Sequence, residues 1–408
     1  MTTAATATPA STRRSILLLS FATFSSMTSQ RICDAMLPEL SREFTVSLGK
    51  AAQVISVFAV VYGLSQLFCG PLGDRIGKYR VVTFATLACA LGSGVCAFAG
   101  SIDALVIARM LVAAGAAAII PLSMAWVGDL VTTAHLQETL ARLGLGSTFG
   151  VVGGQLLGGF LTDAVGWRWA FGFMTLLFGS VGTLLYFNWR KQSPLSTPGG
   201  HAVSAGNAGF VRQSLSMLIA PWPRTVLAVA LLEGASGFGV LAIWASHLHS
   251  THHLSLSMAG SIVALFGLGG VLYMAVARHL IRRFGQVGLC LVGGALVGLS
   301  ALVLGLTPYW YLSIPAGLFG GFGFFMFHNT MQANATQMTP KTRGTAVSLF
   351  ACALFIGQSL GVMAAAALIA PLGSGVVVAL GGGVITALGA YFAYALRQRE
   401  KHLHPLPT

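Results

Sequence analysis

Apolar stretches long enough to cross a lipid bilayer recur along nearly the whole chain. A membrane-spanning helix needs about 20 predominantly apolar residues, and only 8% of the 408 residues are charged. A soluble protein has about 25% charged residues, so this chain has too few to cover a surface that faces water. The sequence predicts an all-α membrane protein with twelve transmembrane helices, which we place at residues 15–38, 50–70, 80–100, 103–127, 139–162, 168–189, 224–245, 256–277, 286–306, 309–332, 343–369 and 374–395.

The basic residues lie mainly in short polar segments on one side of the predicted membrane. The chain has 23 Lys and Arg residues and a formal net charge of +13. These residues are not clustered on one face or arm, as nucleic-acid binding requires, but are placed as the positive-inside rule expects. We predict a multi-pass integral membrane protein of the bacterial inner membrane, with both termini in the cytoplasm and no nucleic-acid partner.

The longest polar interruption divides the predicted helices into six and six. The sequence GQxLG occurs in the fifth predicted helix, at residues 154–158, and again in the eleventh, at residues 357–361. This echo indicates a duplicated unit and two pseudo-symmetric six-helix bundles. The predicted organisation is a cytoplasmic N-terminal tail (1–14), a first bundle (15–189), a cytoplasmic central loop (190–223), a second bundle (224–395) and a cytoplasmic C-terminal tail (396–408).

Neither the cysteine nor the histidine residues show the full pattern of a metal site. The six cysteines lie within or at the edge of apolar stretches and lack metal-ligand spacing, so we expect free thiols and no metal. Residues 247–253, HLHSTHH, resemble one histidine box of membrane di-iron desaturases. Such a site needs several boxes on one side of the membrane, and the other histidines are scattered. A histidine-box membrane metalloenzyme is therefore a remote alternative, and we expect neither enzyme activity nor a cofactor.

The loop between the second and third predicted helices carries a recognisable motif. Residues 70–80, GPLGDRIGKYR, resemble the GxxxDRxGRR loop of the major facilitator superfamily, with Tyr79 as a departure. The resemblance implies a cytoplasmic gate in which the loop pairs with an acidic residue at the end of helix four. We also expect the aspartate to cap a neighbouring helix; the alternative is that the charges only anchor the loop. The implied gate residues are Gly70, Asp74, Arg75, Gly77, Lys78, Arg80 and Asp129.

Two further motifs favour the twelve-helix drug:proton antiporter branch of that family. Glycines at positions 146, 150, 154 and 158, followed by Gly159, resemble the antiporter motif GxxxGPxxGG of helix five, with Gln155 where proline is expected. Residues 34–38, DAMLP, resemble the DxxxP of helix one. The glycine residues implied by the motif are Gly146, Gly150, Gly154, Gly158 and Gly159. Because Gln155 replaces the proline, export and uptake both remain as alternatives for the direction of transport.

Charged residues within the first and fourth predicted helices are candidates for proton coupling. Arg31 and Asp34 are three residues apart, so we expect them on one helical face. Arg109 in helix four is expected at a similar depth, within reach of Asp34. A carboxylate that faces a cavity can exchange protons when access alternates. The alternative is a structural ion pair that fixes two helices.

Glu233 is the carboxylate of the seventh predicted helix and lies near mid-membrane. An acid at that depth is a functional candidate, although it could instead bond a neighbouring helix. His328, Asn329, Gln155 and Gln358 could supply polar contacts to a ligand, or hydrogen bonds between helices. We place Glu233 level with Asp34 as a proton or substrate site.

These expectations combine into one functional hypothesis. The resemblance implies a secondary active transporter that couples the entry of protons to the export of small organic or amphipathic compounds by alternating access. The alternative is a proton-coupled uptake symporter for an organic solute. The expected partners are a small-molecule substrate, protons and the lipid bilayer, the energy source is the proton gradient, and the family resemblance favours a monomer.

Overall fold

Helices make up nearly all of the described chain. The computed structural model describes residues 10–131, 133–191, 207–339 and 343–403. In chain order the elements are α1 (Ala10–Arg31), α2 (Leu37–Glu43), α3 (Leu48–Ala51), α4 (Gln53–Ile76), α5 (Lys78–Ala97), α6 (Ile102–Leu130), α7 (Thr133–Val165), α8 (Trp167–Lys191), α9 (Asn207–Ile219), α10 (Pro221–Glu233), the π-helix η2 (Gly234–Gly239), α11 (Trp244–His252), α12 (Leu256–Leu306), the short η3 (Trp310–Leu312), α13 (Ser313–Gln337), α14 (Arg343–Leu372) and α15 (Ser374–Leu403).

Each of the twelve predicted spans overlaps helical structure over most of its length. Among the described residues, nine helical segments are long and apolar enough to cross a membrane. The longest, Leu256–Leu306, covers two predicted spans. Its backbone leaves helical geometry at Gly285, with φ of 61°, and this kink divides it into the two spans. α1 and α7 lie outside that set of nine and occupy the first and fifth predicted spans. The predicted all-α class is confirmed, and the count of twelve is consistent with the structure.

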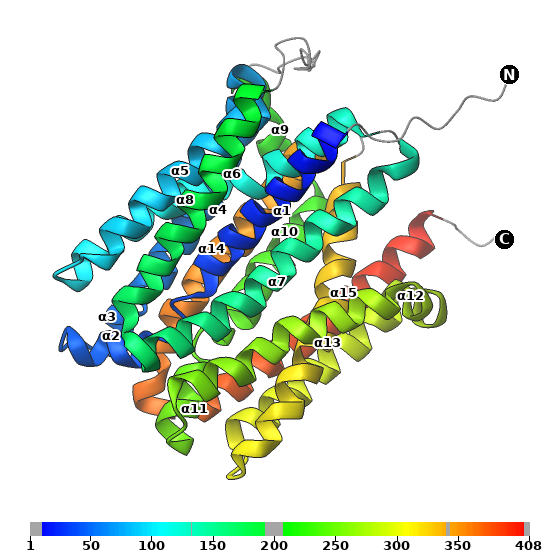
Figure 1. The fold of residues 1–408 in the computed structure, drawn as a ribbon. Coiled ribbons are helices and arrows are strands. Elements are labelled where there is room, and N and C mark those ends of the chain that lie inside the picture. Colours follow the sequence, from blue (N-terminus) through cyan, green and yellow to red (C-terminus); the bar gives the residue numbers. More distant parts are fainter. Residues whose placement is uncertain (1–9, 132, 192–206, 340–342, 404–408) are drawn as a thin grey trace, which may run out of the picture.

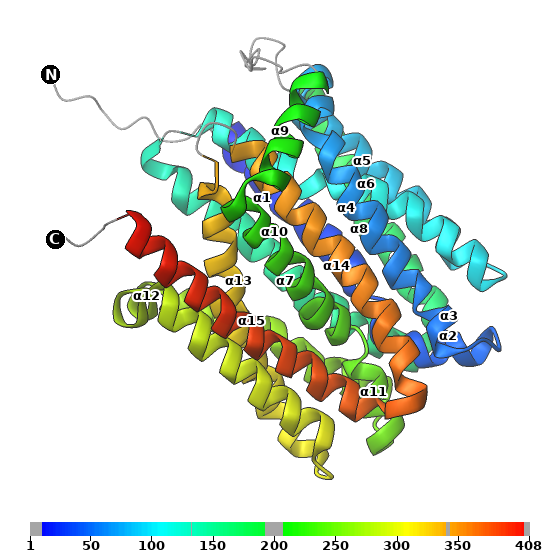
Figure 2. The same ribbon diagram turned by 180° about the vertical axis from the view of Figure 1, so that it is seen from behind.

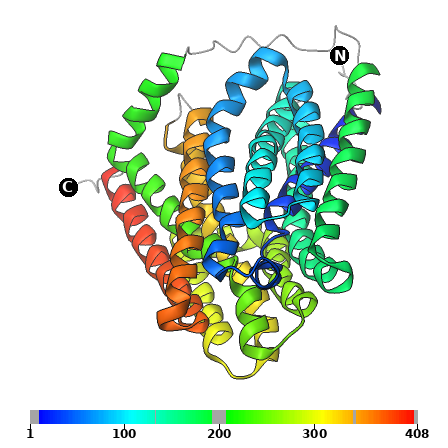
Figure 3. The ribbon, with the colours of Figure 1, turned by 90° about the vertical axis from the view of Figure 1, so that its left-hand side faces the viewer.

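The helices form two bundles that pack side by side (Figures 1 and 2). The hydrophobic core of the first bundle runs from Leu18 to Leu185, and that of the second mainly from Met217 to Leu396. α4 packs against α14 and α7 packs against α12, so these four helices join the halves; Figure 3 shows α4 and α14 side by side. The first turn of α1 and the last turn of α15 lie at one end, called here the terminal end. α2, α3 and α11 lie at the opposite, distal end (Figure 1).

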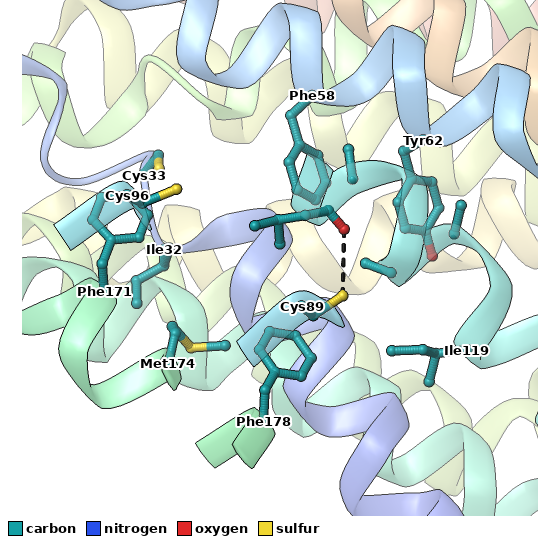
Figure 4. Packing of buried hydrophobic residues seen from close by; sticks show 14 of the residues in the cluster. Ile32, Cys33, Phe58, Tyr62, Cys89, Cys96, Ile119, Phe171, Met174 and Phe178 are labelled. Carbon is teal, nitrogen blue, oxygen red and sulfur yellow. Dashed lines mark hydrogen bonds between the residues drawn. The ribbon is translucent and has the colours of Figure 1, made fainter. Parts of the chain in front are cut away.

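The core of the first bundle contains sulfur as well as aromatic and aliphatic side chains (Figure 4). The thiol of Cys89 lies 3.4 Å from the carbonyl oxygen of Val112, so it links α5 to α6. All six cysteines of the chain are free and buried, as the sequence predicts. Burial among apolar neighbours suits these thiols to a packing role.

Glycines allow α7 to lie directly on α1. A methyl group built on Gly150 would lie 2.4 Å from the carbonyl oxygen of Phe24, and one built on Gly158 would lie 2.2 Å from that of Ile32. Gly146 and Gly154 meet the α1 backbone in the same way. Close backbone approach through small residues is how membrane helices associate without a hydrophobic driving force. The four-residue spacing therefore has a direct packing cause.

The second bundle repeats this arrangement. A methyl group on Gly357 would lie 1.9 Å from the carbonyl oxygen of Leu231 in α10, and one on Gly361 would lie 2.1 Å from that of Ala235 in η2. The two copies of GQxLG thus each pack on the first helix of their own half. This correspondence gives the echo in the sequence a structural basis.

The prediction of one continuous helix over residues 15–38 is wrong. α1 ends at Arg31, residues 32–36 form turns, and α2 begins at Leu37. Pro38 in the first turn of α2 has no N–H to bond the carbonyl of Asp34, and its ring opposes a helix through that residue. The seventh predicted helix is also interrupted, by η2 and then by a turn before α11.

Helices extend into the segments that flank the second bundle. α9 agrees with the short helix that the sequence indicates at residues 208–220 of the central loop, and α10 begins at Pro221, just before the predicted start of the seventh helix; residues 192–206 are outside the described part of the chain. α15 continues to Leu403, through most of the predicted C-terminal tail.

Candidate functional site

The interruption of the first helix brings Arg31 and Asp34 together in the interior. Both side chains are fully buried, and Arg31 Nη1 lies 3.3 Å from Asp34 Oδ2. Asp34 lies in the turn that follows α1 rather than on the expected helical face. The pair therefore forms as predicted, but the break in the helix, and not helical spacing, sets its geometry.

Glutamine side chains connect this pair to α7 and to the second bundle. Gln155 Nε2 donates a hydrogen bond of 2.7 Å to Asp34 Oδ2. Gln30 Nε2, next to Arg31, lies 3.4 Å from Gln358 Oε1 of α14. The two glutamines of the repeated GQxLG motif thus both lie at this site, one on the acid and the other at the boundary between the halves.

Arg31 also contacts the second bundle through an aromatic ring. Its guanidinium carbon lies 4.6 Å from the centroid of Phe238 in η2, a distance that allows a cation–π interaction. Phe238 packs edge-on against Phe324 of α13, with centroids 4.8 Å apart. The cation held by Asp34 therefore lies against an aromatic wall of the other half.

Arg109 does not form the expected ion pair with Asp34. Its Nη1 atom donates to the carbonyl oxygen of Ser29 at 2.8 Å, its Nε atom lies 3.4 Å from the carbonyl oxygen of Val54, and its guanidinium covers the ring of Phe58 at 4.0 Å. The residue is fully buried, and its Nη2 atom has no hydrogen-bond partner. Arg109 therefore joins α6 to α1 and α4 through carbonyl groups.

Glu233 ends α10 and pairs with a residue that the sequence also singles out. Its Oε1 atom lies 2.9 Å from His328 Nδ1 of α13, and the carboxylate is fully buried. The imidazole stacks on Phe324, with centroids 5.6 Å apart and planes at 10°. Asn329, the next residue, is half-buried. Glu233 and His328 thus form a second polar site, next to the same aromatic wall.

The π-helix after Glu233 marks the second interruption. Gly234, Gly237 and Gly239 of η2 each lie against α14 or Phe324, at distances that a side chain would not allow. π-helical turns occur often at functional sites, and transporters form their sites where membrane helices are discontinuous. The first helix of each half therefore departs from regular α-helical geometry next to a buried acid, by a turn after Arg31 and by a π-helical segment after Glu233.

The two halves are closed against each other at the distal end. Asp163 Oδ2 of α7 accepts hydrogen bonds of 2.6 Å from both the backbone N–H and the hydroxyl of Ser257 in α12. A methyl group on Gly159 would lie 2.2 Å from the carbonyl oxygen of Leu256. Asp34 and Glu233 are sealed from solvent in this conformation. Exchange of a proton or ligand with either acid therefore requires the halves to move.

The loop between α4 and α5 lies at the terminal end and gathers charges. Lys78 Nζ lies 2.5 Å from Asp129 Oδ2 at the end of α6 and 3.8 Å from Asp74 Oδ1. Gly77 has φ of 100°, a conformation that glycine adopts without strain. Asp74 does not cap α5, whose N-cap is Gly77 with no side-chain hydrogen bond.

The remaining residues of this motif lie apart from that cluster. Arg80 lies over the rings of Phe84 and Trp189, and a methyl group on Gly70 would meet nothing within 4 Å. Arg75 is exposed. The structure thus brings together Asp74, Lys78 and Asp129, and leaves the other gate residues outside their contacts.

The histidine-rich stretch is part of a helix and does not resemble a metal centre. His247 is buried, with Nδ1 2.8 Å from Ser374 Oγ and Nε2 3.1 Å from the carbonyl oxygen of Leu304. His249 Nδ1 lies 2.7 Å from the carbonyl oxygen of Leu254. Within the described part of the chain, no group of three or more His, Cys, Asp or Glu residues is placed to hold a metal ion. His247 ties α11 to α12 and α15.

Some contributors to the site have no clear signal in the sequence. Phe238 and Gln30 lie in apolar or mixed stretches, and only the fold shows that they face the partner half. In the sequence, Asp163 is an acidic residue near a helix end with no special feature, and only the structure reveals its contact with Ser257. Pro38 and the three glycines of η2 were the available signals for the interruptions.

Comparison with known proteins agrees with this architecture. The family model for the Major Facilitator Superfamily matches residues 19–361 and 226–408. A protein of Bacillus subtilis (strain 168) named "Uncharacterized MFS-type transporter YceJ" is 24% identical over 334 residues, which are 80% of this chain and 82% of that protein. The "Putative multidrug resistance protein MdtD" of Salmonella typhi is 27% identical over 65% of this chain, but the match spans only 59% of its length.

Solved structures show the same fold at low identity. A bacterial homologue of the human lysosomal transporter Spinster matches with a TM-score of 0.72 at 17% identity, over 95% of this chain and 96% of that one. A POT family transporter in complex with 5-aminolevulinic acid matches with a TM-score of 0.74 at 15% identity, over 93% and 95%. The family model and the transporter name of the relative from Bacillus subtilis are those of membrane transporters, and they give no support to the metalloenzyme alternative. The chain belongs to the major facilitator superfamily of membrane transporters.

Proposed function

We propose that this transporter exports small organic or amphipathic compounds in exchange for protons, and that Asp34 and Glu233 carry the protons. The observation that carries the proposal is the state of the two acids. Each is fully buried beside a departure from regular α-helix, and each has one carboxyl oxygen that finds no hydrogen-bond partner among the described residues, Oδ1 of Asp34 and Oε2 of Glu233. A protonated carboxyl group gains an O–H donor at such an oxygen.

The two acids are placed so that movement of the halves changes their surroundings. Asp34 belongs to the first half, but Arg31, its partner, lies against Phe238 of the second. Glu233 belongs to the second half and adjoins the same aromatic wall through His328. Separation of the halves removes Arg31 from Phe238 and admits water to the site. Uptake and release of protons by the acids are thereby coupled to the change in which side of the membrane the site opens to.

Closure at each end involves different residues. The Asp163–Ser257 contact holds the distal end, and the cluster of Lys78, Asp74 and Asp129 lies at the terminal end. We place the terminal end in the cytoplasm of a bacterial cell, with the chain in the inner membrane as a monomer. The multidrug resistance name of one set of relatives supports export. Uptake is the alternative, because position 155 carries glutamine where the antiporter motif has proline.

The test is substrate flux in proteoliposomes with an imposed pH gradient. Purified protein is reconstituted with a pH-sensitive dye inside the vesicles, and candidate compounds are added one at a time. Exchange predicts that substrate and protons move in opposite directions, and that a gradient alone concentrates substrate on the acidic side. Accumulation on the side toward which the protons move would establish the uptake symporter instead. Substrate flux whose rate and direction do not depend on the pH gradient would contradict proton coupling.

A further inference from the structure

The hydrogen-bonding capacity of Arg31, Asp34 and Gln155 is only partly used. Asp34 Oδ2 accepts from both Arg31 Nη1 and Gln155 Nε2. Within the part of the chain that the structure describes, Arg31 Nε, Asp34 Oδ1 and Gln155 Oε1 have no hydrogen-bond partner, although all three residues are buried. Buried polar atoms in folded proteins are nearly always paired, and an unpaired one calls for an explanation. A ligand that pairs these atoms recovers the free energy lost by their burial.

The unpaired atoms include a hydrogen-bond donor as well as hydrogen-bond acceptors. Arg31 Nε is a donor on a cation, Asp34 Oδ1 is an acceptor on an anion, and Gln155 Oε1 is a neutral acceptor. A complementary ligand therefore presents an acceptor to Arg31 and donors to Asp34 and Gln155. A carboxylate and an ammonium group on one small molecule supply both.

The balance of buried charge favours the same ligand. In the state in which both acids have released their protons and His328 is neutral, Arg31 and Asp34 neutralise each other, and Arg109 and Glu233 add one further buried charge of each sign. A ligand with a net charge adds an uncompensated charge to this interior, which is unfavourable. A zwitterion adds none.

The aromatic wall defines the other part of the ligand. Arg31 lies over Phe238, and Phe238 packs against Phe324 and lies 5.9 Å from His328. An apolar group attached to the zwitterion can take the place of the guanidinium on this wall when the halves separate. We propose that the site between the halves binds zwitterionic compounds with an apolar side chain, of which an apolar α-amino acid is the simplest. This inference rests on the proposed function, because it assigns the substrate class of the same site.

Matched probes test the inference on the purified full-length protein. L-phenylalanine carries both charged groups, phenethylamine keeps only the ammonium, and 3-phenylpropionate keeps only the carboxylate. L-leucine, isoamylamine and 4-methylpentanoate form a second series with an aliphatic side chain. Calorimetric titration is expected to show binding of the amino acid in at least one series, with each singly charged analogue weaker by about tenfold or more, because a buried charged group loses its partner.

Variants at Arg31 and at Asp34 test each charged partner of the ligand separately. Arg31→Gln is expected to bind the amine more tightly than the amino acid, since Asp34 keeps its charge. Asp34→Asn is expected to bind the carboxylate more tightly, since Arg31 keeps its own. Arg31→Lys keeps the cation and is expected to keep the preference for the amino acid, with weaker binding, and it serves if Arg31→Gln does not fold.

The outcomes separate this inference from the proposed function. Tighter binding of the amine than of the amino acid by the unaltered protein, no discrimination within a series, or no amino-acid binding in either series would overturn the zwitterion proposal. Proton exchange driven by some other compound would then leave the proposed function standing. Binding of the amino acid as expected, with no proton-coupled flux, would overturn the proposed function and leave the ligand class intact.

Discussion

Gln155 donates a hydrogen bond of 2.7 Å to the carboxylate of Asp34. The two residues are 121 positions apart, and the sequence suggested each of them for a separate reason. Gln155 stands where the helix-five glycine motif is expected to carry proline, and Asp34 opens the DxxxP segment. A departure from one motif therefore contacts the charged residue of another, at the point where α7 lies directly on α1.

Removal of either buried acid is expected to uncouple transport from the proton gradient. Asp34→Asn and Glu233→Gln keep the size of each side chain but cannot release a proton, so we expect gradient-driven accumulation to be lost. Downhill exchange of substrate between vesicle interior and exterior is expected to continue, although Asp34→Asn removes the partner of a zwitterion's ammonium group and therefore requires a higher concentration of such a substrate. Glu39→Gln is the matched control, because Glu39 forms a surface pair with Arg42 at 2.6 Å, and such pairs contribute about 0–1 kcal/mol. Equal effects on both kinds of flux would mean that the acids are structural.

Asp74→Asn is expected to slow turnover without changing substrate affinity. Asp74 lies 3.8 Å from Lys78, which also binds Asp129, at the terminal end and away from the buried acids. Turnover in proteoliposomes and equilibrium binding in detergent separate the two effects. Asp103→Asn provides the comparison, since Asp103 forms an exposed pair with Lys50 at 2.5 Å. An unchanged turnover number would remove the gate role from this loop.

Gly158→Ala is expected to destabilise the first bundle. The added methyl group would lie 2.2 Å from the carbonyl oxygen of Ile32, so α7 must separate from the turn that follows α1, and overpacking of this kind costs about 1–3 kcal/mol. Gly144→Ala on the same helix meets nothing within 4 Å and should stabilise slightly, by about 0.5–1 kcal/mol, because alanine favours the helix. Thermal unfolding of the two variants in detergent measures the difference. Similar melting temperatures would show that α7 does not require the close approach.

Glu43 is expected to contribute stability that depends on pH. The hydrogen bond from Arg168, together with that from Trp167 Nε1, lowers the pKa of the Glu43 carboxyl from its ordinary value of 4.5. A lowered pKa in the folded state means that the contribution is complete above the ordinary value and is lost as the pH falls through the lowered one. The melting temperature of the unaltered protein should therefore exceed that of Glu43→Gln at pH 7, and the difference should shrink below pH 4.5. A difference that stays constant down to pH 3 would count against this ion pair.

Long apolar stretches and the loop at residues 70–80 were sufficient to predict the all-α fold and its family. The length of an apolar stretch indicates whether it can cross a bilayer as a helix, so the twelve spans could be predicted without knowing which helices contact each other. The interruptions were harder, because Pro38 and the glycines of η2 lie within otherwise apolar stretches. Their effect depends on packing against other helices.

The partners of the charged residues could not be predicted in the same way. The sequence places both arginines within reach of Asp34, but only Arg31 pairs with it directly, and Arg109 binds the carbonyl groups of Ser29 and Val54. Glu233 and His328 were both candidates, but their pairing joins α10 to α13 across 95 positions. Such choices depend on the rotation of each helix about its axis, and the nearly uniform apolar character of these helices does not define that rotation.

The most direct test of the account is access to the boundary between the halves from each side of the membrane. Gln30→Cys, in a protein whose six native cysteines are replaced, places a thiol beside Gln358. Labelling with a membrane-impermeant thiol reagent is measured in right-side-out and inverted vesicles, with a protein that keeps only Cys89 as the control, because that thiol lies in the core of the first bundle. Alternating access predicts that the thiol at position 30 reacts from both sides and that Cys89 reacts from neither. Reaction at position 30 from one side only, whatever the pH or added substrate, would contradict the account.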